Sequence, residues 1–348
     1  MTVRAPDTTP LAGPPASEAA ADRASVRPAT DELLRAPQGA AARPTGDRVF
    51  AASLTLLALT VVGVPALMLL SLLWASRHAI VRFGPGFITS SRWDPVHEQF
   101  GAWPFVWGTV FSSILALCLA VPVSIGLAIF LSDLAPRPVR KPLGFVVELL
   151  AAIPSVVYGF WGIFVLVPFL RDDVQPFLGA HLGFLPLFRG EPLGFGMLAA
   201  SIVLAIMIVP TITSISREVM QAVPGIHREA AIGLGATPWD VVRVAVLPAA
   251  RSGIVGAVIL GLNRALGETM AVTMVIGNRP KVSTSLFDPA YTMASVLANE
   301  FAEADSDAYL SALSEIALLL LGVAFVMNLL ARWLVNVTKQ RIRGDVAR

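Results

Sequence analysis

Long apolar stretches without charges recur along the chain and alternate with short polar segments. A helix needs about 20 residues to cross the roughly 30 Å hydrocarbon core of a bilayer, and six stretches are long enough. None of them alternates apolar and polar residues at every second position, as the strands of an outer-membrane barrel do. The pattern predicts an all-α membrane protein with six transmembrane helices, at residues 49–76, 105–131, 142–170, 192–216, 252–278 and 308–331.

The composition supports this prediction and excludes several other classes of protein. Hydrophobic residues make up 55% of the 348 and charged residues only 14%, whereas soluble domains have about 45–50% and about 25%. Cys118 is the only cysteine and lies in an apolar stretch, which excludes a disulfide scaffold. His78, Asp94 and His97 are too irregularly spaced for a metal site. We therefore expect neither a metal ion nor a cofactor in this chain.

Basic residues are distributed unevenly between the segments that connect the apolar stretches. With the amino terminus in the cytoplasm, 18 arginines and lysines fall on the cytoplasmic side and seven on the outer side. Cytoplasmic loops of membrane proteins carry the excess of Lys and Arg. We therefore expect both termini to be cytoplasmic.

The chain divides by composition into four parts. Residues 1–48 are rich in alanine and proline and are expected to be a disordered cytoplasmic tail. The first apolar stretch is too long for a signal peptide, so we interpret 49–104 as the first transmembrane helix and a periplasmic connection. Residues 105–336 are expected to form the transmembrane core, and 337–348 a second cytoplasmic tail.

No segment carries a nucleotide-binding or catalytic motif. The phosphate-binding loop of ATPases needs Gly-Lys before Ser or Thr, and Lys141, Lys281 and Lys339 follow Arg, Pro and Thr. The sequence also has no nucleophile elbow and no His-Glu-x-x-His pair. We expect a transport subunit that is not an enzyme, and any ATPase that drives it is another chain.

The segment 217–251, between the fourth and fifth apolar stretches, predicts a compact pair of short helices. The first covers 226–234, and Gly235 follows where a helix end favours a residue with positive φ. A Thr-x-x-Asp capping box starts the second helix, over 238–247. Pro248 is expected to end it. On local physics alone, the segment is equally an ordinary helical hairpin that covers the end of a bundle.

This segment resembles the EAA loop of ABC importer permeases. Glu-Ala-Ala is followed after three residues by Gly, and after nine more by Ala-x-Leu-Pro, with Ala245 where a large aliphatic residue is usual. The resemblance implies a type I ABC importer permease (MetI-like) fold, in which this loop docks into a groove of the ATP-binding subunit. The residues that would form the ATPase-coupling loop are Glu229, Ala230, Ala231, Gly235, Leu247 and Pro248.

The fifth apolar stretch contains an arginine at a depth where charges are costly. Arg264 lies about 18 Å beyond Ser252 in a helix, and inserting an arginine there costs about 2.5–3.5 kcal/mol. Glu268 is one helical turn further, within reach of an ion pair. Such a pair is either a structural lock between helices or part of a substrate path. A guanidinium can bind a tetrahedral oxyanion bidentately, which favours an anion over a sugar or a cation.

Three segments resemble the C-type permease subunit of phosphate-specific ABC importers. They are Arg-Ala-Leu-Gly-Glu-Thr-Met-Ala-Val at 264–272, Glu-Leu-Leu-Ala-Ala-Ile-Pro-Ser-Val-Val-Tyr-Gly at 148–159 and Trp-Asp-Pro at 93–95. The resemblance implies a heterodimer with an A-type permease, two cytoplasmic ATP-binding subunits and an extracytoplasmic phosphate-binding protein, in a bacterial cytoplasmic (inner) membrane. It also implies a phosphate path that includes Arg264, Glu268 and Thr269.

The third predicted helix offers a further set of candidates. Glu148, Ser155 and Tyr158 belong to the segment that resembles the phosphate permeases and form a possible gate. Glu148 lies near the inner membrane surface, where a solvated glutamate is at least as good an interpretation. Glu315 in the sixth stretch is interpreted as a carboxylate near the start of a helix.

Two other functions remain open. An ABC permease for another oxyanion, sulfate or molybdate, fits the same coupling loop. A secondary anion transporter would use an ion gradient and would usually show internal repeats, which the halves of this chain do not show. Lipid is expected as a further partner, and nucleic acid is not.

Overall fold

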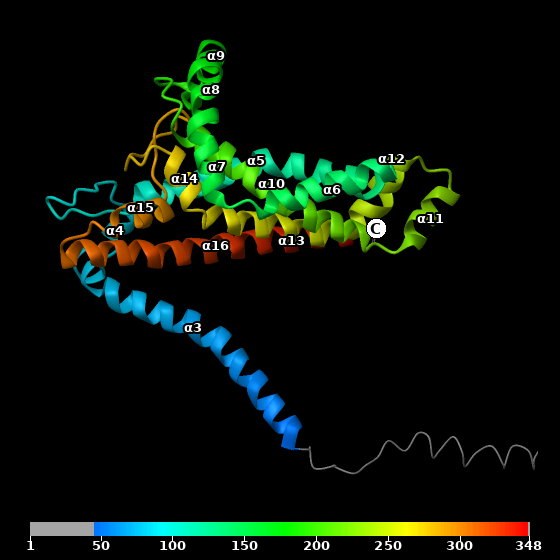
Figure 1. The fold of residues 1–348 in the computed structure, drawn as a ribbon, viewed down its shortest axis with the longest axis horizontal. Coiled ribbons are helices and arrows are strands. Elements are labelled where there is room, and N and C mark those ends of the chain that lie inside the picture. The colour runs from blue at the N-terminus through cyan, green and yellow to red at the C-terminus, as the bar shows by residue number, and fades with distance from the viewer. Residues whose placement is uncertain (1–44, 347–348) are drawn as a thin grey trace, which may run out of the picture. The chain divides into compact units, whose positions relative to one another are not determined.

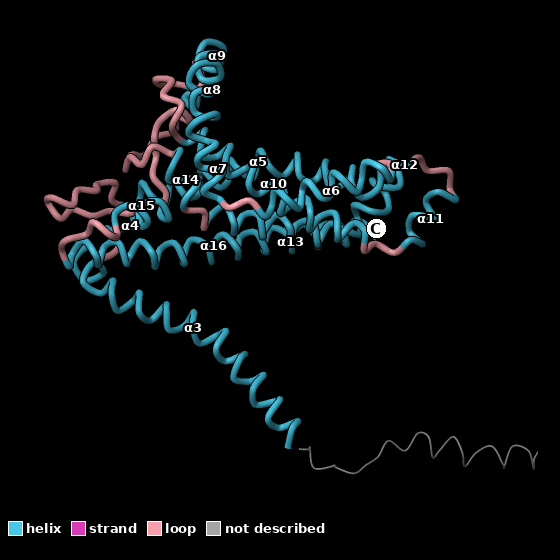
Figure 2. The backbone as a smooth tube through the Cα atoms, viewed as in Figure 1, coloured by secondary structure: helices cyan, strands magenta, loops and turns pink. Residues whose placement is uncertain are grey.

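The structure is a computed structural model that describes the backbone of residues 45–346 and the side chains of residues 46–333. Within this range the chain is helical, with no strand beyond one isolated bridge between Asp94 and Gln99 (Figures 1 and 2). The expected disordered tail lies outside the described residues, except from Thr45 onward, where a helix begins.

The chain forms two units, Met1–Pro65 and Ala66–Arg348. α3 (Thr45–Phe83) passes from the first into the second and contains Pro65. In the first unit its apolar side chains are exposed on all sides, Val61 to 74%. A helix that is apolar all round is typical of a membrane span.

Six helices of the described residues are long and apolar enough to cross a membrane, which confirms the predicted number. The second, fourth and sixth match the predicted stretches to within a few residues at each end, and include α5 (Trp103–Ile129), α10 (Met197–Gln221) and the first part of α16 (Asp307–Val346). The six spans are Gly46–Phe83, Trp103–Leu134, Ser155–Leu182, Met197–Gln221, Pro238–Leu266 and Asp307–Trp333.

The prediction of a third membrane-crossing helix at 142–170 is wrong. The chain forms α6 (Arg137–Ala152), leaves the helical conformation at Ile153, and starts a new helix that spans Ser155–Leu182. Pro154 causes the break, because the residue before a proline avoids the helical conformation. Residues expected in an outer connection therefore belong to the third membrane-crossing helix. This helix comprises α7 (Ser155–Trp161), α8 (Val167–Phe169) and α9 (Gln175–Leu182), joined by π-helical turns.

Each π-helical turn in the described residues ends two residues before a proline. In an α-helix, the proline ring collides with the carbonyl four residues earlier. That carbonyl belongs to the central residue of each turn. At Pro168, Pro176 and Pro248 the helix continues and the wider turn accommodates the ring, whereas before Pro136 the helix has already ended at Ala135. Pro248 therefore lies inside a helix that continues from Pro238 to Leu266, so the predicted end of a short helix at Pro248 is wrong. The turns are Phe130–Leu134, Gly162–Leu166, Leu170–Val174 and Val242–Val246, before Pro136, Pro168, Pro176 and Pro248.

The main hydrophobic core of the second unit is built around α10. This helix packs against α5 on one side and against α13 (Leu247–Leu266) on another. Its residues Val203, Ile208 and Ile212 are completely buried. In Figure 1, α11 (Gly225–Gly233) and α12 (Pro238–Val241) lie at one end of these helices, and α14 (Met270–Val275) lies at the other end.

A second core is rich in aromatic residues and joins α4 (Gly86–Thr89), α15 (Met293–Glu300) and the start of α16. The Glu300 carboxylate organises it: Oε2 accepts hydrogen bonds from Trp93 Nε1 at 2.8 Å and from the Tyr309 hydroxyl at 2.6 Å. Trp93, of the Trp-Asp-Pro segment, also packs edge to face against Phe105. The connection before α5 is therefore fixed to α15 and α16.

Candidate functional site

The fifth predicted helix, at 252–278, is interrupted in its middle. α13 ends at Leu266, residues 267–269 are not helical, and α14 follows. The Gly267 amide closes the last turn of α13 by donating to the carbonyl of Asn263 at 3.2 Å. The prediction of a single continuous helix is therefore wrong. Arg264 lies beside a helix break instead of in the middle of a helix.

The two helices that begin after a break, α7 and α14, pack against each other. A Cβ atom on Gly159 would collide with Met274 Sδ and lie 3.2 Å from Ala271 Cα, so this close approach requires glycine. The Tyr158 hydroxyl donates to the Leu150 carbonyl at 2.8 Å and so connects the two sides of the first break. Helix interruptions of this kind expose backbone and polar groups where a substrate can pass.

Arg264 is half-buried and reaches a neighbouring helix. Its Nη1 donates to Thr211 Oγ1 of α10 at 3.5 Å, the long limit of a hydrogen bond. Arg264 lies in the last turn of α13, where the partial negative charge of a helix C-terminus stabilises a cation. No carboxylate in the described part of the chain forms an ion pair with Arg264. Most of its five N–H donors are therefore available to an anion.

The expected ion pair between Arg264 and Glu268 is not formed. The Glu268 Oε1 atom instead accepts a hydrogen bond at 3.2 Å from the Ala271 amide, in the first turn of α14. A carboxylate is stabilised at a helix N-terminus, and the break removes the one-turn spacing on which the expectation rested. Thr269 is the N-cap residue of α14, and its hydroxyl donates to the Gly267 carbonyl at 3.4 Å. Glu268 and Thr269 thus belong to the same break as Arg264.

The candidate gate residues lie in two different environments. Tyr158 is buried and lines an apolar cavity of about 290 Å³ between α7 and α10. Ser155 is half-buried in the first turn of α7, immediately after the break. Glu148 is exposed on α6, and its Oε1 accepts from Arg217 Nη2 of α10 at 3.1 Å. Ser155 and Tyr158 therefore belong to the first break, whereas Glu148 forms an ion pair with Arg217 away from it.

The segment between α10 and α13 confirms two details of the predicted helical pair. Gly235 follows α11 with φ +84°, a conformation that side chains with a Cβ rarely adopt. The capping box is present, because Asp240 N donates to Thr237 Oγ1 and Thr237 N donates to the Asp240 carboxylate. The second helix does not stop at 247 and continues into α13.

The same segment exposes large apolar side chains. Leu234 is 90% exposed, and Ile226 and Ile232 are exposed as well. Several large apolar side chains exposed on one short segment favour an interaction site. The residues that the resemblance assigns to the coupling loop belong to the same segment. Glu229, Ala230 and Pro248 are exposed, and Ala231 and Leu247 are half-buried.

Arg228 fixes this segment to the bundle, and the sequence reasoning missed it. Its Nε donates to Asp133 Oδ1 at 3.0 Å, and its two other nitrogens donate to the carbonyls of Val223 at 2.7 Å and Met220 at 2.8 Å. Asp133 lies at the end of the second span, so one guanidinium joins α11 to two helices. The only sequence signal was a basic residue directly before Glu229.

Three polar residues near Arg264 were also missed. Thr211 of α10 accepts from Arg264, and Asn328 of α16 bonds with Asn263 of α13. Polar residues inside apolar stretches were the available signal, because intramembrane polar groups need partners. Their pairing depends on which helices are neighbours, which the sequence pattern does not specify.

A family model and several sequence relatives match most of this chain. The model of the family "Binding-protein-dependent transport system inner membrane component" matches residues 120–344. The phosphate transport system permease protein PstC of Mesorhizobium japonicum is 47% identical over 83% of this chain and 89% of that protein. The PstC protein of Haemophilus influenzae is 45% identical over 84% of this chain and 94% of its own length. A solved structure, the MetNI methionine ABC transporter in an inward-facing conformation, aligns with a TM-score of 0.49 at 17% identity, over 71% of this chain and 99% of that one.

Proposed function

The chain belongs to the binding-protein-dependent transport system inner membrane components and, within them, to the PstC permeases, and from this premise we propose that it is the permease subunit that carries inorganic phosphate through an ATP-driven importer. Relatives named for phosphate transport cover more than four fifths of the chain at 45–47% identity. Nothing in the chain favours the sulfate or molybdate alternative.

The observation that carries the proposal is Arg264 beside the break between α13 and α14. An arginine at membrane depth is costly unless it serves a path or a partner, and this one has no carboxylate partner among the described residues. Its planar donors match the oxygens of phosphate. Arg264 binds the passing anion, Glu268 holds the start of α14, and Thr269 offers a hydroxyl at the same break. Ser155 and Tyr158 gate the path from the neighbouring break.

Energy reaches this path from other chains. The exposed apolar residues Ile226, Ile232 and Leu234 dock onto a cytoplasmic ATP-binding subunit, together with Glu229 and Ala230. Two such subunits, an A-type permease and an extracytoplasmic phosphate-binding protein complete the importer. In this arrangement the coupling segment and both termini are cytoplasmic, and the chain itself neither binds nor hydrolyses ATP.

Uptake of radiolabelled phosphate tests the proposal. Cells that lack this chain but contain its partners should regain uptake when the chain is restored, and Arg264→Gln should not restore it. Excess unlabelled phosphate should compete, and equal concentrations of sulfate or molybdate should not. Competition by sulfate or molybdate as strong as that by phosphate would assign the chain to another oxyanion.

A further inference from the structure

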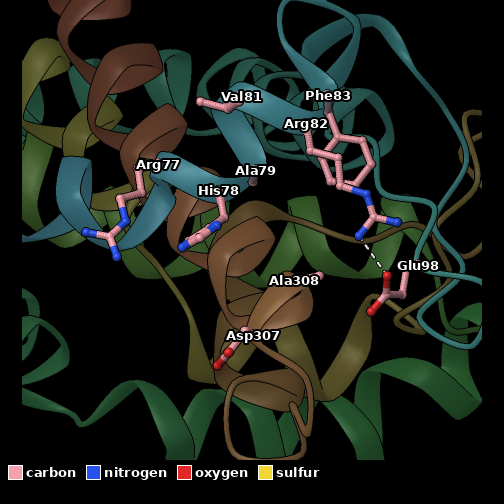
Figure 3. A pocket seen from close by; sticks show the side chains of 9 residues that line it. All are labelled: Arg77, His78, Ala79, Val81, Arg82, Phe83, Glu98, Asp307 and Ala308. Carbon is pink, nitrogen blue, oxygen red and sulfur yellow. Dashed lines mark hydrogen bonds and ion pairs between the residues drawn. The ribbon is translucent and has the colours of Figure 1, made fainter.

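A cavity of about 750 Å³ with charged residues in its walls opens between the end of α3 and the start of α16, far along the sequence from Arg264 (Figure 3). Its walls are residues 77–79 and 81–83 of α3, Glu98 from the following connection, and Asp307 and Ala308 of α16. This volume lies within the range of ligand sites, about 300–1,000 Å³. The cavity is therefore large enough for a small organic ligand or for the headgroup of a lipid.

The walls of the cavity are held in fixed positions. The Ser311 hydroxyl of α16 accepts the Ala79 amide at 3.0 Å and donates to the Ala75 carbonyl at 2.9 Å. It thus bridges these two backbone groups of α3 and fixes one helix to the other. At the other end, Arg82 and Glu98 form an ion pair at 2.7 Å. Contacts within the chain therefore hold the walls of the cavity in place.

The depth of the cavity is that of lipid headgroups. The apolar stretch of α3 ends at Ser76, and that of α16 begins at Ala308. Trp74 is 71% exposed, and the Arg77 guanidinium carbon lies 4.1 Å from the centre of its ring. Tryptophan and arginine at the end of an apolar span mark the membrane–water interface.

The charges around the cavity have opposite signs on opposite walls. Arg77 and His78 belong to α3 and Asp307 to α16, and Figure 3 shows these side chains at the same opening. Arg82 is already paired with Glu98, whereas Arg77 and Asp307 have no ion-pair partner among the described residues. A ligand that satisfies both walls carries an anion and a cation together.

We propose that this cavity binds the headgroup of a zwitterionic phospholipid with a primary ammonium, that is, a phosphatidylethanolamine. Arg77 and His78 bind the phosphodiester, and Asp307 accepts hydrogen bonds from the ammonium. The acyl chains lie along the exposed apolar side chains Leu70 and Leu73 of α3. The site is independent of the phosphate path.

Lipid retention by the assembled transporter tests this proposal. The complex, purified with its partner subunits in mild detergent, is incubated with vesicles of phosphatidylethanolamine, phosphatidylglycerol or phosphatidylcholine, and bound lipid is counted by native mass spectrometry. We expect preference for phosphatidylethanolamine. Asp307→Asn should reduce its preference over phosphatidylglycerol about tenfold, because a charge-assisted hydrogen bond is lost. Arg77→Gln should weaken the binding of both phosphatidylethanolamine and phosphatidylglycerol. Arg92→Gln, an exposed arginine outside the cavity, should change neither.

A second measurement separates lipid from a covering protein. Val81 lines the cavity and is 87% exposed, so Val81→Cys in a Cys118→Ser background reports access to a soluble maleimide. Labelling of the delipidated complex that phosphatidylethanolamine vesicles suppress supports the proposal. Protection in the delipidated complex would assign the cavity to a partner subunit. Either that result or equal lipid retention by Asp307→Asn and the unaltered chain overturns the lipid site.

Discussion

Asn328 of α16 donates a hydrogen bond of 2.6 Å to Asn263 Oδ1 of α13, at the turn that ends in the break beside Arg264. The backbone carbonyl of Asn263 also accepts the Gly267 amide that closes this turn. On the next residue, Arg264 reaches Thr211 of α10. The last turn of α13 is therefore attached to two neighbouring helices by two consecutive side chains.

Asn328→Leu should loosen this turn without removing a substrate contact. Interhelical hydrogen bonds in membranes contribute about 0.6–1.7 kcal/mol, so the melting temperature of the assembled complex should fall slightly, and phosphate uptake per complex should fall with it. The double variant with Asn263→Leu should be no worse than either single variant. Met327→Leu serves as the control, and strictly additive losses would show that the two asparagines act separately.

Arg264→Gln should abolish phosphate uptake while the complex still assembles. The amide keeps some hydrogen bonding but loses the charge that attracts the anion. Arg264→Lys keeps the charge without the planar donors, and we expect intermediate uptake. Uptake is measured per amount of assembled complex in proteoliposomes. Normal uptake by Arg264→Gln would make the arginine structural.

Glu268→Gln and Glu268→Ala should differ in thermal stability, because the Glu268 carboxylate accepts the Ala271 amide in the first turn of α14. Glutamine retains an acceptor for the Ala271 amide, so Glu268→Gln should assemble normally. Glu268→Ala leaves this amide without its partner, and loss of a cap costs about 1 kcal/mol. Thermal unfolding of the purified complex distinguishes the two. If both variants are equally stable, the hydrogen bond to Ala271 does not support the break.

Gly235→Asp should prevent coupling and leave membrane insertion intact. A Cβ at Gly235 would meet no atom within 4 Å, but the positive φ of 84° disfavours aspartate there, and the added charge lies beside the exposed Leu234. Gly235→Asn should be milder because asparagine tolerates this conformation better. Gly233→Ala, which also meets no atom, is the control. The measurement is co-purification of the ATP-binding subunit with phosphate uptake, and full uptake by Gly235→Asp would contradict docking at this segment.

Arg228→Ala should detach α11 from the bundle. It removes the ion pair to Asp133 and leaves two carbonyls without a donor, and breaking a partly buried, hydrogen-bonded ion pair is strongly destabilising. ATP hydrolysis by the assembled complex should then no longer respond to the phosphate-loaded receptor. Arg228→Lys should recover only part of the response, since an ammonium cannot reach all three acceptors. A full response in Arg228→Ala would show that α11 is positioned by other contacts.

The sequence predicted the features that depend on local chemistry. Six apolar stretches were enough to count the membrane-crossing helices. The positive φ of Gly235 and the capping box of Thr237 follow from neighbouring residues alone. The match of 264–272 and 148–159 to phosphate permeases was sufficient to identify the family.

The breaks and their consequences were not predictable in the same way. Pro154 and Pro248 have the same local chemistry, yet one ends a helix and the other lies inside one. A π-helical turn accommodates Pro248, whereas Pro122 and Pro210 lie inside helices without such a turn, so the outcome depends on the packing of the whole helix. Once Gly267–Glu268 leaves the helix, the expected spacing of Arg264 and Glu268 no longer applies, and the partners become Thr211 and Ala271.

The helix that runs from Pro238 to Leu266 joins the proposed coupling segment to the proposed anion contact, so the two lie at opposite ends of one lever arm. At 1.5 Å per residue Arg264 lies about 39 Å from Pro238, so a tilt of about 5° at the ATPase end moves the arginine by about 3 Å. That displacement is as long as a hydrogen bond, and it would carry the guanidinium out of reach of Thr211. A small rotation at the ATPase end therefore suffices to exchange one set of partners of the arginine for another, provided that the α10 side chains packed against α13 move with it.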